Sequence, residues 1–307
     1  MIMKSIKWID KNHDTIQYKM YSNCHLTVKF LENYPDSKEE TVYLITDEKV
    51  STKSLFSKFD ELFDSFGSIN IKMGVLKDDP DGHLECLDGP CFYIGNEPSF
   101  NKSLKKLNNS QAYMSKKAST QACHIGYQRH FGNPQNKQSI SLGDLNRDID
   151  QAKAVLRNLD SIVLNMDAIK KSDSFFNGSW ISGMTIEQAC LLTRTAASTS
   201  KNKFFSIDIG HESPNDNCIE NLCLLFWYYL EGVKNRKIED PENVNSQVYL
   251  VESEFFDHPI QFIKNKVTNS WWLKDPNSGE LKACSKQDYL EASKGNIPDA
   301  LLSLSNL

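Results

Sequence analysis

Hydrophobic positions in the second half of the chain alternate between short apolar runs and stripes with helical spacing. Apolar runs at residues 122–128, 161–167 and 204–209 predict buried strands. Stripes of apolar residues predict helices over residues 144–159 and 217–235. Strands that alternate with helices predict a mainly parallel sheet with helices on both faces. The expected fold class is therefore α/β, with three α-β-α layers.

Weaker signals complete the outline. Further strands are predicted at residues 26–31, 42–46, 69–76 and 91–94, at 248–251 as a final core strand, and around Trp271 and Trp272. Further helices are predicted at residues 55–66 and 104–107, and after a capping box formed by Thr185 and Gln188. A last helix is expected to begin after Ser285 and to end at Gly295. We expect one domain over residues 1–307, in which residues 1–120 are weakly assigned and residues 121–307 are better matched.

Composition and charge exclude several classes of protein. The net charge of -5 gives no basic surface for nucleic acid. Residues 1–14 lack a continuous apolar stretch, and the longest apolar run, at 222–230, is too short to span a bilayer. The cysteines show no zinc-site spacing, and Cys190 and Cys223 fall in apolar helical stretches, where thiols act as small hydrophobes. We expect a cytoplasmic protein with reduced thiols that binds neither nucleic acid nor a membrane.

Polar residues follow two of the predicted strands. Asn165 and Asp167 are two positions apart at a strand end, so both side chains are expected on one face, where a metal could bind. Asn165 is neutral, however, and a satisfied polar strand end is the alternative. His211 and Glu212 follow the strand at 204–209, where they line a ligand site or belong to a loop that caps the next helix.

Other candidate residues have structural alternatives. His124 within a strand and His130 after it are each a ligand, a proton carrier or a hydrogen-bonded structural histidine. The alternating acids from Asp144 to Asp150 imitate a calcium loop, but Ile149 stands where that loop needs glycine. These acids are interpreted as residues of a first helical turn. The sequence contains no Walker loop, nucleophile elbow or zinc-protease motif.

From residue 123 onward, the chain resembles the arginase/formiminoglutamase (ureohydrolase) family, in a divergent bacterial branch. The segments that carry the resemblance, in the same order as in the family, are residues 124–128 (HIGYQ), 155–173, 183–197, 205–216, 227–236, 271–272 and 284–292. The resemblance implies a three-layer α/β fold. It also implies two manganese ions, because many members use them to bridge a hydroxide that attacks a guanidino or formimino carbon.

The chain departs from the family where its metal ligands are expected. The Asp-x-Asp strand end reads Asn165-Met166-Asp167, and Gly95-Asn96 is at best a remnant of the Gly-Gly-x-His element. We find no Asp-x-His-x-Asp element between residues 96 and 123, and the family glutamate falls near His211 or Ile209. Asp167 is then the only clean metal ligand, and no metal or other cofactor is expected.

The sequence leaves three hypotheses. The first is an arginase-like pseudoenzyme that binds a small molecule or a protein partner in a pocket lined by Asn165, Asp167, His211 and Glu212, with His124 nearby. The second is an active hydrolase of a guanidino or formimino carbon–nitrogen bond. In it, Asp167 would bind manganese with help from His124 or His211. The third is a structural subunit that assembles into a homo-oligomer.

Overall fold

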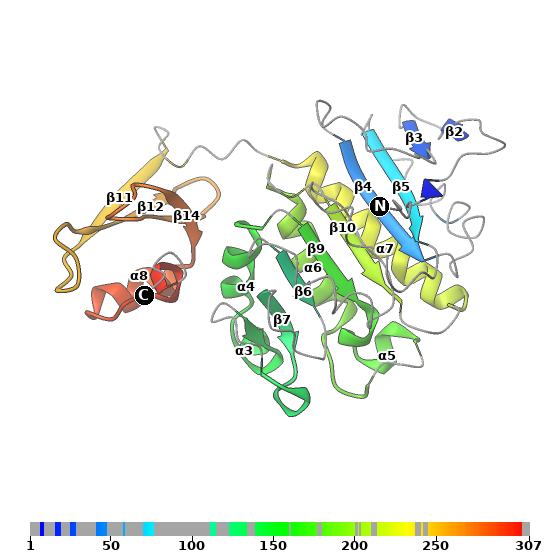
Figure 1. Ribbon diagram of the computed structural model, residues 1–307, viewed down its shortest axis with the longest axis horizontal. Coiled ribbons are helices and arrows are strands. Elements are labelled where there is room, and N and C mark those ends of the chain that lie inside the picture. Colours follow the sequence, from blue (N-terminus) through cyan, green and yellow to red (C-terminus); the bar gives the residue numbers. More distant parts are fainter. Residues whose placement is uncertain are drawn as a thin grey trace, which may run out of the picture.

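A computed structural model was analysed (Figure 1). It describes residues 7–8, 16–19, 25–28, 41–47, 58, 70–76, 111–114, 123–133, 139–159, 161–176, 180–199, 202, 204–209, 214–236, 241 and 245–302. The strands predicted at 91–94 and the helix predicted at 104–107 lie outside them.

The main sheet contains ten strands and is mostly parallel. Its strands are β1 Lys7–Trp8, β2 Ile16–Lys19, β3 His25–Val28, β4 Thr41–Asp47, β5 Asn70–Leu76, β6 Gln111–Met114, β7 Cys123–Tyr127, β8 Ile140–Ser141, β9 Ser161–Asn165 and β10 Phe204–Asp208. The order across the sheet is β2-β3-β5-β4-β10-β9-β6-β7-β8, with β1 beside β5. Only the β1–β5 and β2–β3 pairs are antiparallel. The predicted α/β class with a mainly parallel sheet is confirmed.

Helices α4 Ile149–Leu156, α6 Ile186–Ala197 and α7 Asp216–Lys234 form one layer on this sheet (Figure 1). Lys58, in the segment predicted to be helical, is helical and forms an ion pair of 3.0 Å with Glu220 of α7. This contact places Lys58 beside the same layer. These helices account for one helical layer of the predicted three-layer fold.

Side-chain caps define where these helices begin. Thr185 and Gln188 form the predicted capping box at the start of α6. Asn215 caps α7 by accepting a hydrogen bond from Cys218 N at 2.9 Å. Behind the caps, Gly232 of α7 lies so close to α6 that an added Cβ would be 2.4 Å from the carbonyl oxygen of Arg194.

The single helix predicted over residues 144–159 is wrong. The chain forms α3 Leu142–Arg147 and then α4, with a break at Asp148. Asp148 is extended, with φ -151 and ψ 94, and its carboxylate accepts a hydrogen bond from Asp150 N at 3.0 Å. The aspartate thus competes with the helical hydrogen bond and starts a second helix. The apolar stripe gave no sign of this break, because it continues across it.

A large hydrophobic core lies between the helices and the main sheet. It includes three fully buried aromatic residues, and the ring of Phe205 contacts those of Phe226 and Tyr229. Cys190 and Cys223 are buried in this core as free thiols, as predicted. No helix in the described part of the chain is long and apolar enough to cross a membrane.

A second, antiparallel sheet follows the main one. Its strands, in order, are β11 Ser246–Val251, β12 Ile260–Asn265, β13 Trp271–Lys274 and β14 Leu281–Cys284. Helices α8 Lys286–Ser293 and α9 Asp299–Leu302 follow β14, and α8 begins at the predicted cap Ser285. The strand around Trp271 and Trp272 is therefore confirmed. Residues 248–251 are not a core strand of the main sheet, because they form the exposed edge β11, and an apolar run alone does not identify its sheet.

Two residues that follow α4 join the second sheet to the main body. The amide of Asn158 donates to Ala283 O at 2.8 Å and accepts from Ala283 N at 2.9 Å. Arg157 donates to Cys284 O at 2.9 Å, and its guanidinium lies 5.0 Å from the centroid of the Trp272 ring. The expectation of one domain over residues 1–307 stays a prediction.

Candidate functional site

The predicted pair Asn165 and Asp167 lies at the carboxyl end of β9, but not on one strand. The strand ends at Asn165, and Met166–Ala168 form a turn of 3-10 helix. The buried side chain of Asn165 accepts a hydrogen bond from Asp167 N at 2.9 Å. The expectation that both side chains point to one face of a strand is therefore wrong, because the amide oxygen of Asn165 closes a turn instead.

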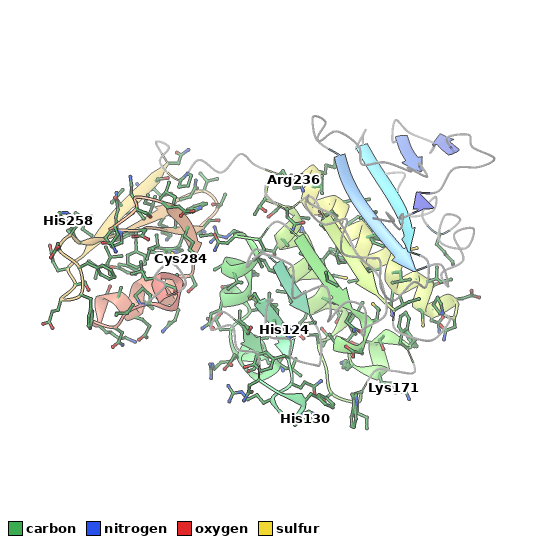
Figure 2. The ribbon with its side chains drawn as sticks, in the orientation of Figure 1. His124, His130, Lys171, Arg236, His258 and Cys284 are labelled. Atoms are coloured by element: carbon green, nitrogen blue, oxygen red, sulfur yellow. The ribbon has the colours of Figure 1, made fainter. Side chains whose placement is uncertain are left out.

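The other predicted site residues are not brought to this strand end among the described residues. His124 lies within β7, is fully buried, and donates its backbone N–H to Ser139 Oγ at 3.0 Å (Figure 2). His211 and Glu212 lie outside the described residues. One further carboxyl-bearing residue has its backbone here: Asp208 of β10 pairs in register with Asn165. Had β9 and β10 been predicted to be adjacent parallel strands, Asp208 near the end of one would have been expected beside Asn165 at the end of the other.

The loop that follows β9 is fixed to the end of β7. Gln128 donates to Ser182 O at 3.0 Å, and the Ser182 hydroxyl donates to Gln128 Oε1 at 2.7 Å. Further along the loop, Met184 N donates to Ala168 O at 2.8 Å. Gly126, with φ +77, leaves room for the side chain of Met184, whose sulfur would lie 3.0 Å from an added Cβ. These contacts hold two loops side by side at the carboxyl edge of the main sheet.

Three aromatic rings, those of His130, Phe131 and Trp180, form an aromatic cluster between these two loops. Phe131 follows β7, and its ring meets Trp180 edge-on, with centroids 5.4 Å apart. The ring of His130 lies 4.2 Å from that of Phe131 and 6.5 Å from that of Trp180, and Figure 2 shows His130 at this margin of the molecule. Half of Trp180 is exposed, as is most of its neighbour Ile181. No sequence pattern predicts this cluster, because its members come from separate loops.

A cavity of about 490 Å³ opens beside this cluster, at the carboxyl ends of β7 and β8. It is lined by Tyr127, Gln128, Arg129, His130, Ser141, Leu142, Gly143, Asp144 and Arg147. Ligands of parallel α/β sheets bind at such strand ends. This cavity is therefore the best-placed ligand site among the described residues.

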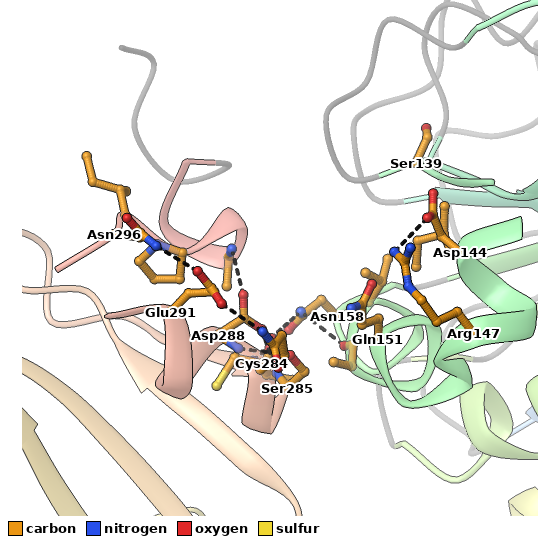
Figure 3. A pocket seen from close by; sticks show the side chains of 18 residues that line it. Ser139, Asp144, Arg147, Gln151, Asn158, Cys284, Ser285, Asp288, Glu291 and Asn296 are labelled. Carbon is orange, nitrogen blue, oxygen red and sulfur yellow. Dashed lines mark hydrogen bonds and ion pairs between the residues drawn. The ribbon is translucent and has the colours of Figure 1, made fainter. Parts of the chain in front are cut away.

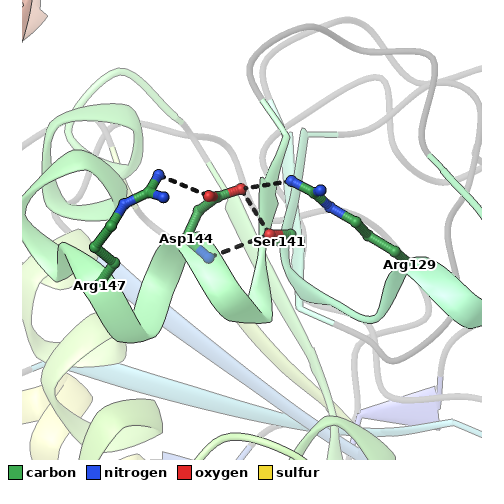
Figure 4. Close-up of polar contacts among 4 residues, drawn as sticks. All are labelled: Arg129, Ser141, Asp144 and Arg147. Atoms are coloured by element: carbon green, nitrogen blue, oxygen red, sulfur yellow. Dashed lines mark hydrogen bonds and ion pairs between the residues drawn. The ribbon is translucent and has the colours of Figure 1, made fainter.

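Asp144 is the polar centre of that cavity (Figure 4). Its carboxylate accepts hydrogen bonds from Ser141 Oγ at 2.6 Å, from Arg147 at 2.8 Å and from Arg129 at 3.3 Å. The hydrogen bond from Ser141, followed by the charges of Arg147 and Arg129, lowers the pKa of Asp144. Both arginine side chains are largely exposed, so they can also donate to an anionic group in the cavity. The sequence analysis assigned Asp144 only to a helix start.

A second cavity, of about 520 Å³, lies between α3–α4 and the second sheet (Figure 3). Its carboxylates already serve local structure. Asp288 closes the capping box with Ser285 at the start of α8. Glu291 accepts hydrogen bonds from Lys294 and Asn296. Asp144 and Arg147 also line this cavity, which lies between α3–α4 and the second sheet.

The described residues do not fit a pair of manganese ions. Two divalent cations held close together need several carboxylate and imidazole ligands to neutralise them. Asn165 offers only a neutral amide at the end of β9, and its oxygen accepts a hydrogen bond from Asp167 N. Within the described part of the chain, no three His, Cys, Asp or Glu residues lie close enough to hold a metal ion.

Comparisons with known proteins give structural matches only. No protein-family model and no curated protein sequence matches the chain. The fold is similar to that of a formiminoglutamase from Trypanosoma cruzi, with 10% identity over 66% of this chain and 97% of that one and a TM-score of 0.47. A related structure of that enzyme was solved with Mn²⁺.

Two further solved structures also have a similar fold. An arginase from Bacillus subtilis has 9% identity over 66% of this chain and 100% of that one, with a TM-score of 0.43. The proclavaminate amidino hydrolase from Streptomyces clavuligerus has 9% identity over 74% of this chain and 100% of that one, with a TM-score of 0.45.

Proposed function

We propose that this chain is an arginase-like binding protein of the cytoplasm that does not hydrolyse guanidino or formimino groups. The observation that carries the proposal is the strand end Asn165-Met166-Asp167. There the amide of Asn165 stands where the resemblance implies a carboxylate, and its oxygen accepts a hydrogen bond from Asp167 N that caps a turn. A neutral oxygen that already accepts a backbone hydrogen bond is a poor ligand for a divalent cation.

The ligand site that supports the proposal is the cavity at the ends of β7 and β8. Its volume of about 490 Å³ suits a small molecule. Arg129 and Arg147 offer guanidinium donors to a carboxylate or phosphate, and Asp144 keeps the local charge balanced. The aromatic cluster of Phe131 and Trp180 supplies an apolar wall nearby. A small anionic molecule is the ligand class that these groups favour.

The first test is turnover. The purified chain, supplied with manganese, is incubated with arginine, agmatine and formiminoglutamate, and released urea and formamide are measured. We expect no product above the protein-free control. Product formation by the native chain would overturn the proposal in favour of an active hydrolase, with Asp167 as a metal ligand.

The second test restores the missing carboxylate. Asn165→Asp keeps the oxygen that caps the turn and adds a negative charge beside Asp167. We expect this variant to bind manganese more tightly than the native chain, because hard cations prefer anionic oxygens. Asn277→Asp, in an exposed turn, is the matched control and should leave manganese affinity unchanged. Equal affinity of the native and N165D chains would mean that Asn165 is not the residue that weakens metal binding.

The third test addresses the cavity. Small carboxylates and phosphates are screened for an increase in the thermal unfolding midpoint, and the ligand found is retested with Arg129→Ala. Stabilisation of the native chain that is lost in R129A supports binding in the cavity. Equal stabilisation of both chains would place the ligand elsewhere.

A further inference from the structure

The two edges of the second sheet differ in what covers them. At the β14 edge, the side chain of Asn158 bonds both the N–H and the C=O of Ala283, so the main body occupies that edge. At the other edge, no described strand pairs with the outer side of β11. Figure 1 shows β11 on the side of the sheet away from the main body. Within the described part of the chain, β11 is thus the one edge of this sheet that is open to another strand.

The backbone groups that point outward from β11 can be identified from its pairing with β12. Lys266 N donates to Asn245 O, so this pair is hydrogen-bonded across the two strands. Antiparallel pairs alternate between bonded and non-bonded, which places Tyr249 among the residues bonded to β12. The N–H and C=O groups of Val248 and Leu250 therefore point to the open edge.

An apolar row on one face of the sheet also ends at this edge. Ala283, Trp272 and Ile263 are buried neighbours on successive strands, and Val248 lies opposite Ile263 on β11. On β11 the apolar side chains are no longer buried: Val248 is 50% exposed and Leu250 is 66% exposed. Another strand at the edge would continue the row and cover both side chains.

We propose that β11 pairs antiparallel with β11 of a second copy of this chain, about a two-fold axis through Tyr249. This register sets Val248 of each copy opposite Leu250 of the other, so each exposed side chain meets an apolar partner. Both residues of such a pair have outward backbone groups, which gives the hydrogen-bonded spacing of an antiparallel ladder. The two copies of Tyr249 then meet at a non-bonded position beside the rings of Trp271 and Tyr289.

Self-pairing fits this edge for two reasons. The strand Ser246–Val251 carries no charged residue and no proline, so a copy of itself meets no like charge directly opposite. Because Asn158 occupies the β14 edge, two such sheets paired through β11 offer no further open edge among the residues that the structure describes. The assembly therefore closes as a symmetric dimer and does not grow into a filament.

Self-association of the full chain is measured by sedimentation velocity over a range of concentrations. We expect a monomer–dimer equilibrium in the native chain. The double variant Val248→Lys, Leu250→Lys places four like charges at the two-fold axis and should weaken dimerisation by at least about tenfold. Val267→Lys changes an equally exposed apolar residue in the β12–β13 turn and should leave the equilibrium unchanged. Near-ultraviolet circular dichroism from Trp271 and Trp272 checks that each variant retains its fold.

A cysteine scan tests the register itself. Residues at a non-bonded antiparallel pair have Cα atoms about 4.5 Å apart, within the range of a disulfide. Tyr249→Cys should therefore form a disulfide-linked dimer under mild oxidation, whereas Gln247→Cys, which faces Val251 of the other copy, should not. A native chain that stays monomeric, a V248K/L250K variant that dimerises as well as the native chain, or cross-linking through position 247 in place of 249 would each overturn the proposal.

Discussion

The close packing of α6 against α7 gives a quantitative prediction for Gly232→Ala. An added Cβ would lie 2.4 Å from Arg194 O and 2.8 Å from Ala197 Cβ. Carbon–oxygen contacts are normally at least about 3.3 Å, so the two helices would have to separate by roughly 1 Å. Overpacking of this kind costs about 1–3 kcal/mol and occasionally more. Alanine has a higher helix propensity than glycine, which offsets this cost by up to about 1 kcal/mol.

We therefore expect G232A to lower the free energy of unfolding by about 2 kcal/mol. The assay is urea unfolding followed by far-ultraviolet circular dichroism. Gly143→Ala in α3 is the matched control, because its added Cβ would meet only Ser141 Oγ at 3.8 Å. It should leave stability unchanged or raise it slightly. A G232A variant as stable as the native chain would show that α6 and α7 do not approach as closely as described.

Two further predictions concern the side chain that joins the second sheet to the main body and two buried thiols. Asn158→Ala leaves both backbone groups of Ala283 without their partner and should lower the free energy of unfolding by about 2 kcal/mol, while Asn277→Ala on an exposed turn should not. Burial raises the pKa of Cys123 and of Cys190 from 9.0 to about 12, so unfolded thiols ionise first as the pH rises. The stabilisation that comes from burying the two protonated thiols is complete below pH 9 and is lost between pH 9 and about 12. Over that range, each thiol lowers the free energy of unfolding by about 1.4 kcal/mol per pH unit. A variant with both cysteines changed to alanine should lose less stability over that range, and an unchanged pH dependence would contradict the assigned burial.

The sequence predicted the parallel core of the fold because its signals there are local. Apolar runs and helical stripes report burial directly, and the cap at Thr185 marks a helix start by its own hydrogen bond. The break at Asp148 was not predicted because the apolar stripe continues past it. The stripe does not show that the side chain of Asp148 caps a second helix. The place of residues 248–251 was missed because an apolar pattern does not tell which sheet a strand joins.

The candidate site was predicted only in part for a similar reason. Asn165 and Asp167 do lie at a strand end, but the hydrogen bond that turns the chain between them depends on a side-chain conformation that spacing does not encode. The cavity around Asp144 unites residues from β7, β8 and α3, and the aromatic cluster joins Phe131 to Trp180 across two loops. Such contacts follow from the order of the strands, which no local pattern specifies.

The number of manganese ions bound per chain, measured by equilibrium dialysis of the native protein followed by elemental analysis, tests the proposed function most directly. Because the end of β9 carries the neutral amide of Asn165 beside Asp167, we predict far fewer than one ion per chain at micromolar free manganese. Two ions per chain at that concentration would contradict the account, since the strand end of β9 would then support the metal pair that we infer it has lost.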